Sequence, residues 1–129
     1  MARPTSRHPT ELELEILKIL WRKSPLPPRE VRDLLVGFRD LAYTSVVTIM
    51  NIMVGKEYLS RRKTGPCFVY KPRISEATTT RRMLRDLTDR AFNGSPAAVM
   101  VNLIEDADLD ADKVRELRAL LKDKGADRK

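Results

Sequence analysis

The sequence of 129 residues contains one cysteine, one histidine and one tryptophan. A single cysteine excludes an internal disulfide framework and a metal site built from several thiolates. One histidine and one cysteine leave no plausible Ser–His–Asp or Cys–His catalytic set, and no zinc-ligand spacing is present. The five glycines form no phosphate-binding loop. We therefore expect a protein that is not an enzyme and that has no bound cofactor.

Long apolar runs are absent as well. No segment is long enough to cross a bilayer, and the N-terminus MARPTSRHPT lacks the apolar centre of a secretory signal. No lipidation motif is visible either. These absences predict a cytoplasmic protein without membrane insertion.

Charge, in contrast, is abundant and unevenly distributed. The formal net charge is +7, and residues 1–73 carry 14 Lys and Arg against seven Asp and Glu. Residues 74–129 carry 11 of each kind. An excess confined to the first part indicates an anionic partner for that part and a different role for the second.

Apolar periodicity and turn signals predict a mainly α (α+β) chain with three parts. Residues 1–9 predict a flexible arm. Residues 10–73 predict helices near 10–23, 27–37 and 44–57 and then a hairpin that turns at Thr64–Gly65. Residues 74–129 predict helices near 75–92 and 95–105, an acidic connector and a last helix. Thr10 and Glu13 form a capping box, and Thr44 is expected to cap the third helix.

The segment AYTSVVTIMNIMVGKEYLSRRKTGPCFVYKPR, residues 42–73, joins the third helix to a strongly basic hairpin. One helix face is apolar at i, i+3, i+4 and i+7 and is therefore buried. The other face carries short polar or methyl-bearing side chains that can lie close to base edges, and an Asn there can pair with adenine. Basic side chains on the hairpin suit phosphates. The predicted DNA-binding residues are Thr44, Ser45, Val47, Thr48, Asn51, Ile52, Arg61, Arg62 and Lys63.

The last three helices carry apolar stripes but too few residues for an evident core of their own. Burial against a second copy solves this problem, and a two-fold dimer suits a palindromic DNA site. The predicted dimerisation residues are Leu84, Leu87, Ala91, Val99, Leu103, Val114, Leu117, Leu120 and Leu121.

The chain resembles the BlaI/MecI/CopY family of penicillinase repressors. The resemblance lies in ELELEILKILW, AYTSVVTIMN, the hairpin ending VYKP, and NGSPAAVMVNLIED. It implies an N-terminal winged helix-turn-helix that binds operator DNA through a small β-hairpin wing and a recognition helix. It also implies a C-terminal helical dimerisation segment. In the family, a membrane sensor with metalloprotease activity triggers cleavage of the repressor, and the matching bond here is Asn102–Leu103.

The sequence departs from the family pattern at several positions. Ile52 stands where the family often has Arg, and Glu57 stands where it often has Gly. Pro66 replaces an Arg at the hairpin turn, and Leu103 replaces the Phe after the cleaved bond. The paired cysteines of the copper-responsive branch are absent, because the sole cysteine is Cys67. These changes affect the expected operator and the expected cleavage specificity, not the expected fold.

The sequence therefore predicts a homodimeric repressor, relieved by proteolysis in a β-lactam resistance type of regulation. Two alternatives remain at this stage. One is a winged-helix regulator that a ligand or partner controls without proteolysis, and the other is a winged helix that serves as a protein-interaction adaptor. Salt-sensitive DNA binding would separate the adaptor from both regulators.

Overall fold

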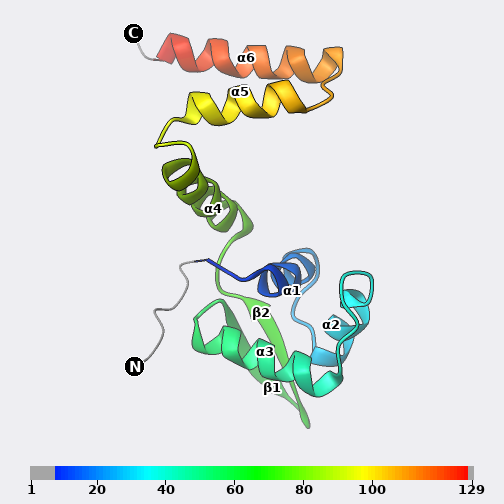
Figure 1. Ribbon diagram of the computed structural model, residues 1–129. Helices are drawn as coiled ribbons and strands as arrows, with labels where there is room; N and C mark the ends of the chain where they lie inside the picture. The colour runs from blue at the N-terminus through cyan, green and yellow to red at the C-terminus, as the bar shows by residue number, and fades with distance from the viewer. Residues whose placement is uncertain (1–7, 128–129) are drawn as a thin grey trace. The chain divides into compact units, whose positions relative to one another are not determined.

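The structure is a computed structural model that describes residues 8–127, so most of the expected flexible arm lies outside the described residues. Within them the chain forms helices and one antiparallel hairpin (Figure 1). Their order is α1 (Glu11–Arg22), α2 (Pro28–Leu35), α3 (Tyr43–Gly55), β1 (Leu59–Thr64), β2 (Cys67–Pro72), α4 (Glu76–Ala91), α5 (Pro96–Asp106) and α6 (Ala111–Asp127).

The chain divides into two compact units, one up to residue 84 and one from residue 85. The division falls within α4, whereas the expected domain boundary lies in the short link before that helix. Each unit is described by itself below.

Helix α1 begins with the predicted capping box, which is confirmed. The Glu13 backbone N–H donates to the Thr10 hydroxyl oxygen at 3.2 Å, and the Thr10 N–H donates to Glu13 Oε1 at 2.8 Å. Both groups would otherwise lack helical partners at this end. The cap positions a helix whose apolar stripe, Ile16, Leu17 and Leu20, is fully buried.

Helix α3 begins one residue earlier than its expected cap, so the prediction for Thr44 is wrong. Ala42 has the extended N-cap conformation, and no side chain caps this end. Thr44 lies inside the first turn, where its backbone carbonyl accepts a hydrogen bond from the Thr48 hydroxyl at 2.9 Å. The apolar face of the helix, which includes Val46 and Met50, is buried as predicted.

The hairpin joins β1 and β2 in a register that runs from Leu59 opposite Pro72 to Thr64 opposite Cys67. The two-residue turn is Gly65–Pro66, one residue later than the predicted Thr64–Gly65. Gly65 has φ +61, a conformation that glycine adopts without steric cost. On the other side of β2, Leu26 exchanges two backbone hydrogen bonds of 3.0 and 2.9 Å with Tyr70. This bridge fixes the hairpin to the link between α1 and α2.

One apolar core fills the space between the three helices and the hairpin. Each of its residues has at most 3% of its surface exposed. Burying an apolar side chain of this size stabilises the fold by about 1.5–3 kcal/mol. It comprises Ile16, Leu17, Leu20, Leu26, Val31, Leu35, Val46, Met50, Met53, Leu59 and Tyr70. Three helices and a two-stranded wing on a shared core form a winged helix-turn-helix, which confirms the predicted fold class.

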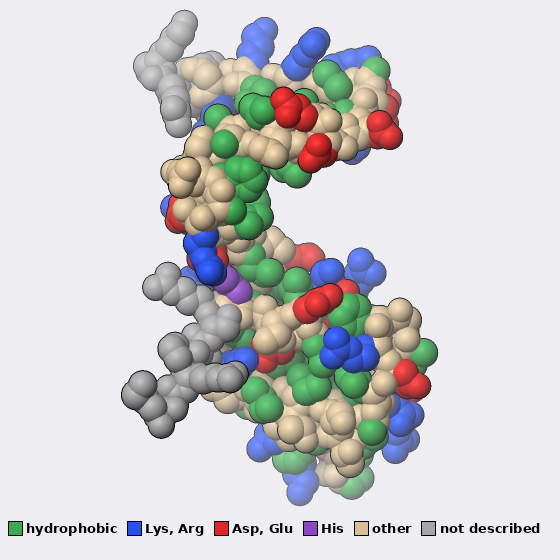
Figure 2. Space-filling view, in the orientation of Figure 1, with side chains coloured by type: hydrophobic (Ala, Val, Ile, Leu, Met, Phe, Trp, Pro, Cys, Tyr) green, Lys and Arg blue, Asp and Glu red, His purple; other side chains and the backbone are tan. Residues whose placement is uncertain are grey.

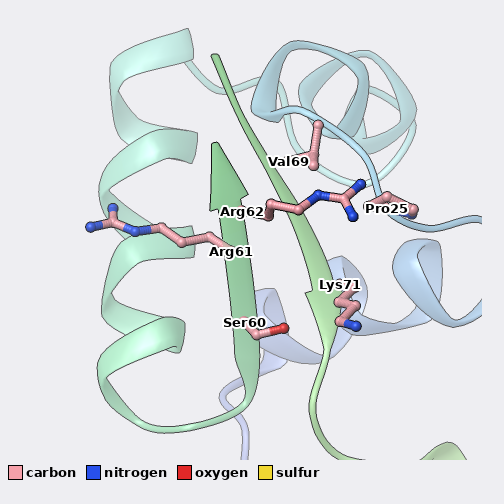
Figure 3. A pocket seen from close by; sticks show the side chains of 6 residues that line it. All are labelled: Pro25, Ser60, Arg61, Arg62, Val69 and Lys71. Carbon is pink, nitrogen blue, oxygen red and sulfur yellow. The ribbon is translucent and has the colours of Figure 1, made fainter. Parts of the chain in front are cut away.

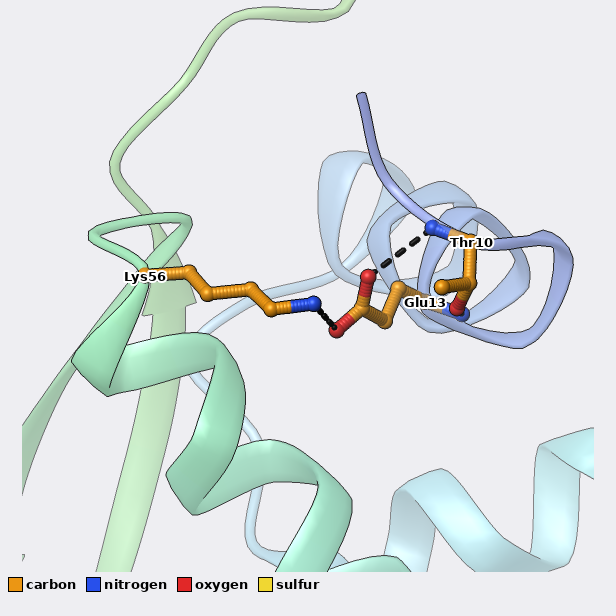
Figure 4. Close-up of polar contacts among 3 residues, drawn as sticks. All are labelled: Thr10, Glu13 and Lys56. Carbon is orange, nitrogen blue, oxygen red and sulfur yellow. Dashed lines mark hydrogen bonds and ion pairs between the residues drawn. The ribbon is translucent and has the colours of Figure 1, made fainter. Parts of the chain in front are cut away.

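A buried ion pair fastens α1 to the end of α3 (Figure 4). Glu13 is only 4% exposed, and its Oε2 accepts a hydrogen bond from Lys56 Nζ at 2.8 Å. The same carboxylate also accepts from Thr10, so both of its oxygens are paired.

Tyr58 lies close to this ion pair. Burial raises the pKa of the Tyr58 hydroxyl above its ordinary value, and the nearby Glu13 carboxylate acts in the same direction while Lys56 opposes it.

The C-terminal unit consists of the second half of α4, α5 and α6. Ser95 caps α5 as the sequence predicts, because its hydroxyl accepts from the Ala98 N–H at 3.1 Å. Asn93 and Gly94 both have positive φ and form the turn before it. Hydrophobic side chains lie at the surface of this unit (Figure 2). Its large exposed apolar residues are Leu87, Met100, Val101, Leu103, Ile104, Leu117, Leu120 and Leu121.

Candidate nucleic-acid interface

The outward face of α3 carries no charge, since Tyr43–Gly55 contains no acidic or basic residue. Thr44, Ser45, Thr48 and Ile52 are exposed, while Val47 is half-buried. Such a surface repels no phosphate and lets a helix approach base edges closely. The predicted contact residues of α3 therefore lie on one side of the helix. All of them are exposed except Val47 and Asn51, which are partly buried.

The hydroxyl of Thr48 is already engaged within the helix. It donates its hydrogen to the Thr44 carbonyl at 2.9 Å, so its methyl group and one face of its oxygen remain for a ligand. Ile52, half exposed, adds another apolar contact on the same helix. Both side chains suit the thymine methyl group better than they suit a hydrogen-bonded base edge.

The basic residues of β1 do not form one patch. Arg61 points toward α3, whereas Arg62 points to the other side of the hairpin, toward Pro25 (Figure 3). This follows from the period of two in a strand, which also puts Lys63 on the same face as Arg61. Arg62 lines a hollow of about 210 Å³ with Ser60 and Lys71. The predicted run of three phosphate contacts is thus divided between two faces.

Asn51, predicted as a base contact, lies where α3 meets the hairpin. Its Oδ1 accepts hydrogen bonds from Arg61 Nη1 at 2.8 Å and from the Tyr70 hydroxyl at 2.7 Å. Arg61 also stacks over the ring of Phe68, with 4.6 Å from its guanidinium carbon to the ring centroid. Sequence analysis did not foresee this network.

An open groove of about 570 Å³ runs between the start of α2, α3 and the wing. Val47 and Asn51 line it from the helix side, and Arg61 and Phe68 line it from the wing. Tyr43 also lines it and is 42% exposed. Tyr43 and Lys71 are not among the predicted DNA-binding residues, although both lie within the singled-out segment 42–73.

Most residues predicted for dimerisation are exposed, from Leu117 at 40% to Leu120 at 66%. Val99 differs, because only 8% of its surface is exposed within one protomer. Val114 is half-buried. These two positions have little area left to offer a partner.

The predicted cleavage bond lies inside α5, less than one turn from the end of that helix. Asn102 and Leu103 are both exposed, and the Asn102 side-chain amide donates to the Ala98 carbonyl at 3.2 Å. The Leu103 carbonyl accepts from the Ala107 N–H at 2.9 Å, which is the last bond of the helix.

Within residues 8–127, no helix combines the length and hydropathy that a bilayer span requires. The same residues contain no group of three or more His, Cys, Asp or Glu side chains placed to hold a metal ion.

The N-terminal unit, with its accessible third helix beside a basic two-stranded wing, defines a winged helix-turn-helix domain of the DNA-binding class. The sequence profile described as penicillinase repressor matches residues 9–123. The chain therefore belongs to the penicillinase repressor family.

Individual relatives match over most of their length. The penicillinase repressor of Bacillus licheniformis is 25% identical over 114 residues, which cover 88% of this chain and 89% of that protein. The transcriptional regulator BlaI of Mycobacterium tuberculosis is 29% identical over 114 residues, with 86% and 83% covered. A solution structure of the DNA binding domain of the repressor BlaI is 29% identical, has a TM-score of 0.47, and covers 53% of this chain and 83% of that one.

Proposed function

We propose that the chain is a transcriptional repressor that binds double-stranded operator DNA as a homodimer. The observation that carries this proposal is the uncharged, accessible face of α3 next to a hairpin with four basic residues. In this arrangement α3 enters the major groove and the hairpin contacts the flanking backbone. Membership of the penicillinase repressor family supports the same function.

A gel-shift assay with salt titration tests DNA binding. The affinity for duplex DNA is expected to fall steeply as salt rises, because Lys and Arg release counterions from phosphates. Arg62→Ala should weaken binding to all sequences by a similar factor, whereas Asn51→Ala should change the sequence preference. If the protein shows no salt-sensitive DNA binding, the domain is a protein-interaction module instead.

The exposed apolar residues of α5 and α6 support dimerisation through the C-terminal unit. Eight large apolar side chains in a unit of this size form a surface that a monomer rarely leaves in water. Linking two DNA-binding domains raises the effective concentration of the second once the first has bound. A dimer therefore binds a palindromic operator far more tightly than one domain binds a half-site.

Relief of repression by cleavage at Asn102–Leu103 follows from this coupling. Hydrolysis of that bond would separate α6 and part of α5 from the DNA-binding domain and so remove much of the dimer surface. The bond lies close to a helix end, where local opening costs least. The family resemblance supports a membrane sensor with metalloprotease activity as the trigger.

Intact-mass measurement of the repressor recovered from its host cells, before and after exposure to a β-lactam, tests this step. A fragment that ends at Asn102 is expected after exposure. If repression is relieved while the chain stays intact, a ligand or partner controls the repressor without proteolysis.

A further inference from the structure

The Asn51 side chain is held by two residues of the wing that lie directly opposite each other. Arg61 and Tyr70 are cross-strand partners, so their side chains leave the same face of the hairpin. Both donate to Asn51 Oδ1, at 2.8 Å from Arg61 and 2.7 Å from Tyr70. Phe68, on the same face, holds the Arg61 guanidinium by stacking. The wing therefore positions a side chain of the recognition helix.

Chemistry alone fixes which way the Asn51 amide points. A guanidinium group has hydrogen-bond donors and no acceptor, so the amide atom that faces Arg61 must be the oxygen. An amide oxygen has two acceptor positions, and Arg61 and Tyr70 occupy both of them. The Nδ2 group has no hydrogen-bond partner among residues 8–127.

We propose that Tyr70 and Arg61 are positioning residues that restrict Asn51 to a donor, so that Asn51 selects guanine instead of adenine in the operator. This inference rests on the proposed DNA-binding function. An Asn recognises adenine with two bonds, accepting from the adenine N6 amino group and donating to N7. With Oδ1 occupied, only the donor remains. The two hydrogens of Nδ2 can then donate to both guanine acceptors, O6 and N7. Adenine offers only N7 beside its N6 donor, thymine offers only O4 beside its methyl group, and cytosine offers a donor that Nδ2 cannot use.

Tyr70 provides the stronger restraint of the two. It is only 1% exposed, so turning its hydroxyl away from Asn51 would leave a buried polar group without a partner. Arg61 is exposed and can exchange Asn51 for water or phosphate at a lower cost. Removal of both donors frees Oδ1 and lets Asn51 form the two-bond pair with adenine.

Binding-site enrichment from a random-sequence duplex DNA library tests this proposal with the full-length protein. We would compare the wild type, Asn51→Ala, Tyr70→Phe and the double variant Tyr70→Phe/Arg61→Ala. The wild type is expected to enrich guanine at one position of each half-site, and Asn51→Ala is expected to lose that preference. The double variant should change the position to adenine, with about a tenfold change in relative affinity.

Arg62→Ala is the matched control, because this neighbouring Arg lies on the other face of the same strand. It should weaken binding without changing any base preference. Circular dichroism establishes that each variant is folded. Tyr70→Phe keeps the aromatic ring in the core, and this single variant should already raise the adenine fraction. It therefore provides the test if the double variant does not fold.

The possible outcomes separate this inference from the proposed function. If the wild type enriches a sequence but prefers a base other than guanine at the position that depends on Asn51, the inference is overturned and DNA binding stands. The same conclusion follows if Asn51→Ala changes no base preference, or if the folded Tyr70 and Arg61 variants keep guanine. If the wild type enriches no sequence and its binding is insensitive to salt, the proposed function itself fails.

Discussion

The two units of this chain differ in how far their apolar side chains are buried. In the N-terminal unit, α1–α3 and the hairpin bury most core side chains almost completely within one protomer. In the C-terminal unit, eight large apolar side chains are between 40% and 66% exposed, and Val99 is the one large apolar residue described there as buried. The first unit has a complete core, whereas the second has an apolar surface.

This difference indicates where the stability of each unit comes from. A closed core stabilises the winged helix at any protein concentration. An open apolar surface is stabilised when a second copy covers it. The stability of the C-terminal unit should therefore depend on protein concentration. This contrast is consistent with the proposed roles, in which the N-terminal unit binds DNA and the C-terminal unit mediates dimerisation. Three substitutions test the comparison.

The largest effect is expected from Leu117→Asp, which puts a charge into the apolar stripe of α6. Leu117 is 40% exposed in one protomer, and a partner that covers it would bury an unpaired carboxylate. We expect monomers in sedimentation experiments and a loss of operator affinity of about a hundredfold or more, because the effective-concentration gain disappears.

Ala119→Asp is the matched control for this substitution. Ala119 is exposed on the side of α6 opposite Leu117, since two residues correspond to about 200° of helix rotation. Ala119→Asp introduces the same charge as Leu117→Asp, and the dimer should persist. A dimeric Leu117→Asp variant would contradict the interface proposed on α6.

A smaller effect, confined to the N-terminal unit, is expected from Leu20→Ala. Leu20 is 1% exposed in the core, so its truncation leaves a cavity and should lower the free energy of unfolding by about 3 kcal/mol. Leu34→Ala on α2 is the control, because Leu34 is 57% exposed and its loss should cost well under 1 kcal/mol. Urea denaturation measures both, and equal losses would contradict the contrast between core and surface.

The sequence predicts the elements of this fold well because its signals are local. The capping box at Thr10 and Glu13, the Ser95 cap and the apolar stripes each lie within a few residues, and all three appear in the structure. The prediction for the cap of α3 is wrong. Ala42 occupies the N-cap position, and because alanine has no side chain that can accept a hydrogen bond, the sequence contains no capping signal there.

The candidate interface was predictable as a region but not in its detail. Asn51 and Arg61 are ten residues apart, and Asn51 and Tyr70 are nineteen apart, so their contacts depend on tertiary packing. The hairpin register was also not predicted. The observed turn at Gly65–Pro66 places Arg61 opposite Tyr70, whereas a two-residue turn at the predicted Thr64–Gly65 would place Arg61 opposite Phe68. The contact between Asn51 and the Arg61–Tyr70 pair depends on how α3 packs against β1. No local sequence pattern specifies that packing.

The smallest effect, and the one opposite in sign, is expected from Glu57→Gly. Glu57 lies between α3 and β1 with φ +66, a left-handed conformation that costs a residue with a Cβ roughly 1–2 kcal/mol. Glycine often stands at this position in the family that the sequence resembles. The Glu57 side chain is 78% exposed, and its 3.7 Å ion pair with Arg73 contributes little in water. Glycine also increases the entropy of the unfolded chain, which offsets part of the gain.

The net expectation for Glu57→Gly is an increase of about 0.5–1 kcal/mol in the free energy of unfolding, measured in urea. Arg73→Ala removes the same ion pair while leaving the backbone as it is, and it should change stability by less than about 0.5 kcal/mol. The degree of association should not change, because residue 57 belongs to the unit that completes its own core. Destabilisation by glycine would mean that contacts of the Glu57 side chain outweigh the backbone strain, and a changed association constant would mean that the two units are not independent.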